Sequence, residues 1–162
     1  MKAYHSVIIA VWALGFTLPS FHAFAQDHLE LAGRTTLTMS GSVSLSIDEF
    51  EALAPRTIIK TSTPWHTATT FSGISGKDFI RVTGATGQTV VVRAINDYQT
   101  KIPISDLTDL GALFVTRMNG KRLSLRQKGP LFVIYPFDQK PELKSELYYG
   151  RSIWQVNKIT VE

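Results

Sequence analysis

Three side chains of different chemistry follow the most apolar strand that the sequence predicts, residues 89–95. They are the carboxylate of Asp97, the phenol of Tyr98 and the ammonium of Lys101. Such groups at the end of a central strand can line a binding site, because loops on a rigid scaffold carry much of the chemistry of folded proteins. They also fit a plain turn in which Asp97 caps its own backbone and Tyr98 covers the core. The sequence leaves both interpretations open.

A basic segment without any acidic residue lies between residues 117 and 128. Its cationic side chains are Arg117, Lys121, Arg122, Arg126 and Lys128. Gly129 and Pro130 follow and predict a tight turn. Arginine and lysine donors in this arrangement can hold an anionic group such as a phosphate. The alternative is the solvated face of a hairpin.

Aromatic residues gather at two further places. His66 follows Trp65 at the end of a predicted strand, which suits either a pocket rim or a surface loop. Near the end of the chain, a second group suits either an interaction surface or the core; it consists of Tyr148, Tyr149, Arg151 and Trp154.

The sequence predicts no metal site. Beyond residue 25 the only histidines are His28 and His66, which have no ligand-like spacing, and the chain has no cysteine. It also lacks the glycine-flanked serine of many hydrolases, a phosphate loop and a dinucleotide fingerprint.

The first 25 residues have the three parts of a cleavable signal peptide. A basic start precedes an apolar run at residues 7–18, which is too short for a membrane-spanning helix, and Ala23 and Ala25 form a cleavage pattern. We therefore expect export by the general secretory route to the periplasm, with no stable membrane span after cleavage. The formal net charge of +4 is mild, and an exported protein rarely meets nucleic acid, so no nucleic-acid partner is expected.

Beyond the leader, residues 26–36 are predicted to form a flexible lead-in and residues 37–162 a single domain. Ser46 and Glu49 have the spacing of a capping box and predict a helix over residues 47–53. A turn at residues 73–76, a helix at 77–82 and a helical turn at 105–110 are expected. Asn119 and Gly120 predict a hairpin turn. The predicted strands are residues 37–43, 57–62, 89–95, 113–116, 122–125, 131–135 and 152–161. The fold class is α+β, dominated by short strands.

Several short motifs occur in an order that resembles the sulfite-oxidase-type molybdopterin-binding domain, in its short exported form. They are residues 37–41, the helix at 47–53, Trp65 with residues 71–73, residues 94–98 with Ile102 and Pro103, residues 118–121, residues 128–131, and Tyr135 with Pro136. The resemblance implies a strand-rich mixed sheet, barrel-like, with a few short helices. It also implies a pterin-type site where the loops after Trp65, Tyr98 and Gly129 converge.

Two departures from that family argue against bound molybdenum. The family's enzymes hold the metal through a cysteine in a stretch that corresponds roughly to residues 61–65, and here that stretch contains threonine and serine instead. A hydroxyl is a poor substitute for a soft thiolate ligand. In addition, the leader has no arginine, whereas exported members that carry a preinserted cofactor travel folded behind a twin-arginine signal.

We therefore expect an extracytoplasmic binding or sensory accessory protein, without molybdenum. Its partner would be a small anionic ligand or a loop of an envelope protein. The candidate ligand-binding residues are Trp65, His66, Asp97, Tyr98, Lys101, Arg126 and Lys128. The alternatives are a molybdopterin-dependent oxidoreductase and an interaction module without a ligand.

Overall fold

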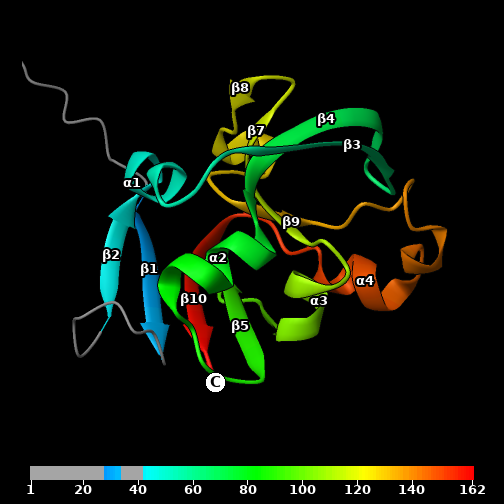
Figure 1. The fold of residues 1–162 in the computed structure, drawn as a ribbon. Helices are drawn as coiled ribbons and strands as arrows, with labels where there is room; N and C mark the ends of the chain where they lie inside the picture. The colour runs from blue at the N-terminus through cyan, green and yellow to red at the C-terminus, as the bar shows by residue number, and fades with distance from the viewer. Residues whose placement is uncertain (1–27, 34–41) are drawn as a thin grey trace, which may run out of the picture.

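The computed structural model describes residues 28–33 and 42–162, which form a strand-rich α+β fold with two open sheets (Figure 1). The first sheet has the order β2-β1-β10-β5-β6 and the second the order β3-β4-β7-β8, with β9 paired to β7. The strands are β1 (His28–Gly33), β2 (Val43–Ser46), β3 (Thr57–Thr63), β4 (His66–Ser75), β5 (Thr89–Ala94), β6 (Gln99–Pro103), β7 (Leu113–Met118), β8 (Lys121–Arg122), β9 (Phe132–Ile134) and β10 (Val156–Val161). Neither sheet closes into a barrel within the described residues.

The first sheet is mixed, because β1 runs parallel to β10 while its other pairs are antiparallel. The segment predicted as a flexible lead-in therefore supplies a sheet strand at His28–Gly33, which corrects that prediction for these residues. Its pairing with β10 joins residues far apart in the sequence, and no local pattern signals such a pairing. The predicted strand at residues 37–43 lies mostly outside the described residues.

The helices are short and lie between and beside the sheets (Figure 1). They are α1 (Ile47–Ala52), α2 (Gly76–Thr83), α3 (Ile104–Thr108) and α4 (Glu146–Arg151), with single 3₁₀ turns η1 (Leu125–Gln127) and η2 (Pro141–Leu143). The capping box at α1 is confirmed: the Glu49 backbone N–H donates to the Ser46 hydroxyl, and the Glu49 carboxylate accepts from the Ser46 backbone.

Two other expectations were wrong. Residues 73–76 do not form a turn, because Gly73 lies within β4, which pairs with β7 there. A Cβ on Gly73 would overlap the Phe114 carbonyl, so close strand contact rather than chain reversal explains this glycine. The closing strand begins at Val156 rather than at residue 152, and β6, most of β4 and α4 were not predicted.

The main core lies where the first sheet meets the helices. Phe50, Phe79 and Phe114 pack together there, with ring centroids 4.8–6.2 Å apart. A second cluster lies against the second sheet and includes Phe71 and Phe132. No helix in the described part of the chain is long and apolar enough to cross a membrane.

The predicted hairpin turn between β7 and β8 is confirmed, with positive φ angles at Asn119 (49°) and Gly120 (78°). We expect Gly120→Ala to lower the free energy of unfolding by about 1 kcal/mol, because a Cβ disfavours this left-handed conformation. Gly150→Ala is the control: Gly150 is helical with open space around it, so alanine should be neutral or slightly stabilising. Equal losses in urea denaturation for both variants would contradict this account.

Candidate functional site

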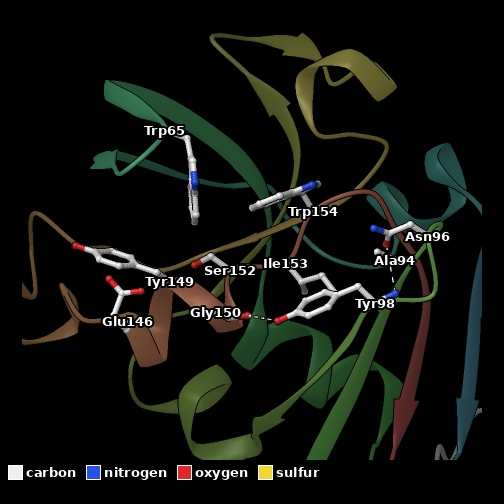
Figure 2. Close-up of a pocket in the computed structure, with 10 residues that line it drawn as sticks. All are labelled: Trp65, Ala94, Asn96, Tyr98, Glu146, Tyr149, Gly150, Ser152, Ile153 and Trp154. Atoms are coloured by element: carbon white, nitrogen blue, oxygen red, sulfur yellow. Dashed lines mark hydrogen bonds between the residues drawn. The ribbon is translucent and has the colours of Figure 1, made fainter.

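A cavity of about 450 Å³ opens between the end of the first sheet and α4 (Figure 2). It is formed by three segments: the β3–β4 turn, the end of β5 with the following turn, and residues 146–154. Its lining consists of Trp65, Ala94, Asn96, Tyr98, Glu146, Tyr149, Gly150, Ser152, Ile153 and Trp154. The volume lies within the usual range of small-molecule sites.

Aromatic rings form one side of the cavity. Trp65 lies between Trp154 and Tyr149, with ring centroids 5.3 and 6.3 Å away and interplanar angles of 74° for both pairs (Figure 2). Behind them, Phe132 of the second core cluster packs 6.3 Å from each indole. The indoles are therefore supported by the core and present a fixed aromatic wall.

The Lys128 ammonium lies over the indole rings of Trp65 and Trp154, but Lys128 does not line the cavity. Its Nζ lies 3.9 Å from the centroid of Trp154 and 5.3 Å from that of Trp65. Burial lowers the pKa of Lys128. Both Lys128 (φ 71°) and Gln155 (φ 55°) adopt the left-handed conformation, and the Gln155 N–H donates to the Lys128 carbonyl at 3.0 Å. Lys128 itself and Gln155, the residue after Trp154, thus both adopt a costly backbone conformation at the Lys128–Trp154 contact.

Few polar groups face the cavity. The Tyr98 hydroxyl donates to the Gly150 carbonyl at 3.4 Å, and the Asn96 side-chain oxygen accepts from the Tyr98 N–H at 3.3 Å. Glu146 is the one charged side chain in the lining, and it has no hydrogen bond or ion pair within the described residues. Figure 2 shows its carboxylate close to Tyr149, on the side of the cavity opposite Tyr98.

A buried ionic cluster anchors the segment that carries Trp154. Arg151 Nη1 and the Tyr135 hydroxyl both donate to Asp106 Oδ2, each at 2.8 Å. Burial raises the pKa of Tyr135, and its hydrogen bond to Asp106 raises it further. Because Arg151 lies between two lining residues, Gly150 and Ser152, this cluster fixes the cavity wall to α3.

His66 lies beside the cavity rather than in it. Its ring packs edge-on against Phe71 at 6.1 Å, and its Nε2 is buried without a hydrogen-bond partner in the part of the chain that the structure describes. Burial and the nearby charge of Lys128 lower the pKa of His66. Both effects favour the neutral form of the imidazole.

The structure places some of the other residues predicted from the sequence at the cavity and the rest away from it. Trp65 and Tyr98 line the cavity, and Lys128 contacts its indoles. Asp97 sits in the turn after β5 and accepts from Arg93 Nε at 3.0 Å, while Lys101 pairs with Glu162 at 2.9 Å. Arg126 lies exposed on η1. Asp97, Lys101 and Arg126 are therefore not brought together with the aromatic wall.

Sequence reasoning missed Glu146 and Asn96 as lining residues. Tyr149 and Trp154 were noted as a cluster but were not chosen as candidates. Glu146 and Tyr149 are three residues apart, so they lie on the same face of α4, and this spacing was the available signal.

Residues 61–63, which lie in the stretch that the resemblance relates to a metal-binding cysteine, do not fit molybdenum. Thr61 is fully buried, and its hydroxyl accepts from the Asp138 N–H at 3.0 Å. The Ser62 hydroxyl donates to Asp138 at 2.5 Å, and the Thr63 hydroxyl accepts from the backbones of Trp65 and His66. All three hydroxyls are thus used within the fold, and hydroxyls are poor ligands for a soft metal. The described residues also hold no group of three or more histidines, cysteines or carboxylates suited to a metal ion.

Comparisons with known proteins support the fold alone. No family model matches the sequence, and no curated protein matches it. Among solved structures, the sulfane dehydrogenase SoxCD from Paracoccus pantotrophus is similar with a TM-score of 0.58 and 12% sequence identity. The match covers 83% of this chain but only 37% of that chain. The fold is therefore related to part of an oxidoreductase, and the likeness does not extend to its activity.

Proposed function

We propose that this chain is an extracytoplasmic binding or sensory accessory protein that holds a small ligand in its aromatic cavity. The observation that carries the proposal is the pair of indoles, Trp65 and Trp154, which line a cavity of about 450 Å³ at a fixed angle. Large aromatic surfaces left partly exposed in a concave site are typical of ligand recognition. The export signal expected from the first 25 residues supports the extracytoplasmic setting.

The position of the cavity also supports binding rather than redox chemistry. It adjoins residues 61–65, the end of β3 and the turn after it, which the resemblance relates to the metal-binding cysteine of the sulfite-oxidase-type family and where this chain has hydroxyls engaged in internal hydrogen bonds. A fold can keep a pocket while its chemistry changes, because function resides in the site rather than in the fold. An anion expected from the basic segment would have to bind near Lys128, outside the lining.

The proposal predicts that some small molecules raise the melting temperature of the full chain, and that the shift increases with the logarithm of ligand concentration above the Kd, as it does for any ligand of the folded state. The screen should contain cationic, neutral and anionic compounds. Trp154→Ala should abolish the shift, because it removes one aromatic wall. Leu147→Ala is the matched control, since Leu147 is a similarly exposed apolar side chain on α4 outside the lining. Shifts that survive Trp154→Ala would place binding elsewhere.

The likeness to a sulfane dehydrogenase favours one alternative, an oxidoreductase that acquires a molybdopterin cofactor. Elemental analysis of protein purified from its native host distinguishes the two. One molybdenum per chain would establish the alternative and overturn the binding proposal.

A further inference from the structure

The charge of the cavity lining restricts the class of ligand. Glu146 supplies a carboxylate, and no lysine, arginine or histidine side chain lines the cavity. We propose that the cavity binds a small organic cation with a methylated ammonium group, held by the faces of Trp65, Trp154 and Tyr149 and by the Glu146 carboxylate. This inference rests on the proposed function, because it assigns the ligand of the same cavity.

The ring geometry matches what such a cation needs. Trp65 stands at 74° to both Trp154 and Tyr149, so the three rings form adjoining walls rather than a flat surface. The negative face of an aromatic ring attracts a cation, and indole does so most strongly. Lys128 already uses this property, with its ammonium 3.9 Å from the Trp154 centroid.

The hydrogen-bonding groups favour a methylated ammonium over a primary one. A primary ammonium brings three N–H donors that must each find an acceptor when water is removed. The Gly150 carbonyl and the Asn96 side-chain oxygen each already accept one hydrogen bond from Tyr98, so the Glu146 carboxylate is the charged acceptor left to receive such donors. A fully methylated ammonium has no N–H donor, so it leaves no donor unsatisfied in this cavity.

Two charges act on such a ligand in opposite directions. Glu146 attracts a cation and would repel an anion, and it has no competing ion pair within the described residues. Lys128, which contacts the same indoles, repels a cation and attracts an anion. Removing each charge in turn therefore reports the sign of the ligand's charge.

The test is isothermal titration of the full chain with choline, with its neutral isostere 3,3-dimethylbutanol, and with acetate. Choline should bind about tenfold more tightly than dimethylbutanol, as expected for a desolvated cation on aromatic faces. Glu146→Gln should weaken choline binding by about fourfold, and Lys128→Met should strengthen it by a similar factor. The affinity for dimethylbutanol should change less than the affinity for choline in both variants, because the isostere carries no charge.

Matched controls remove a charge of the same sign from nearby exposed residues outside the lining. These are Glu142→Gln on η2 and Arg126→Met on η1, and neither should change choline affinity. Melting temperatures of all variants confirm that the fold is retained.

Phosphatidylcholine vesicles form a second arm of the test. Sedimentation of the protein with vesicles, reversed by added choline, would identify a lipid headgroup as the source of the cation. Choline binding without sedimentation would identify a free compound.

The possible failures are distinguishable. Equal binding of choline and dimethylbutanol, tighter binding of acetate, or a Glu146→Gln variant with unchanged or higher choline affinity would overturn the cation assignment and leave the proposed binding function standing. If none of these probes binds while other compounds of the thermal-shift screen still act through Trp154, only the cation assignment is overturned; if no compound of that screen shifts the melting temperature either, the proposed function is overturned as well.

Discussion

Replacing Asp106 by alanine should lower the free energy of unfolding by about 3 kcal/mol, because the substitution leaves a partly buried cation and a buried hydroxyl without their partner. Asp106 is only 3% exposed and accepts from both Arg151 and Tyr135 through one carboxylate oxygen. Urea denaturation measures the loss. Asp109→Ala is the control, since Asp109 is an exposed carboxylate at the end of the same helix and its removal should change stability by less than about 0.5 kcal/mol.

The Asp106→Ala substitution should also weaken ligand binding in the cavity. Arg151 is flanked by the lining residues Gly150 and Ser152, so an unanchored Arg151 frees the segment that carries Trp154. Under native conditions, Asp106→Ala should therefore weaken ligand binding as well as stability. A variant as stable as the wild-type chain would show that the Asp106–Arg151 pair contributes no net stability.

The second large effect concerns Glu51, which joins α1 to β7 and β8. Burial would raise the pKa of Glu51, but hydrogen bonds from Arg117 and Thr116 outweigh it and lower the pKa to about 2. Arg117 donates through Nε at 3.0 Å and through Nη2 at 2.9 Å, and Arg122 adds a contact at 3.1 Å. The carboxylate is thus held in its charged form.

The sign of the pH dependence follows from that lowered pKa. The ionised Glu51 contributes its full stabilisation above its unfolded pKa of 4.5 and loses it as the pH falls towards 2. After discounting for solvent screening, the contribution is about 2 kcal/mol. Glu51→Gln should therefore destabilise the protein by about 2 kcal/mol at pH 7, and the difference from wild type should shrink as the pH falls below 4.5.

Urea denaturation at pH 7 and at pH 3 tests this difference. Glu142→Gln is the control, because Glu142 is exposed on η2 and should give a small difference at both values. An equally large destabilisation by Glu51→Gln at both pH values would contradict the ionic account.

Local features of the fold could be predicted from the sequence because their causes are local. The capping box of α1 depends on residues three apart, and the hairpin turn depends on Asn119 and Gly120 alone. Strand β5 is apolar enough to identify without its neighbours. By contrast, β1 forms through pairing with β10 at the other end of the chain, so a polar-looking segment gave no local signal.

The candidate site could be predicted only in part for the same reason. Trp65 and Tyr98 end up in the cavity because they lie at strand ends, where sequence reasoning placed them. Lys101 lies on β6, and its ammonium pairs with the carboxylate of Glu162. Because these two residues are far apart in the sequence, the residues next to Lys101 could not reveal the pairing. Glu146 lies on α4, which packs against the core through Tyr148 and Tyr149 and is tied to α3 by the Asp106–Arg151 pair, and all of these contacts join residues far apart in the sequence.

The central claim is that the two indoles form a ligand-binding wall, and intrinsic fluorescence tests it most directly. The chain has three tryptophans, of which Trp65 and Trp154 line the cavity. In a Trp12→Phe chain, all tryptophan emission therefore comes from the cavity. We predict a saturable change in that emission on titration with choline or with another compound that raises the melting temperature. Emission that stays constant with every such compound, while urea unfolding still shifts it, would contradict the claim.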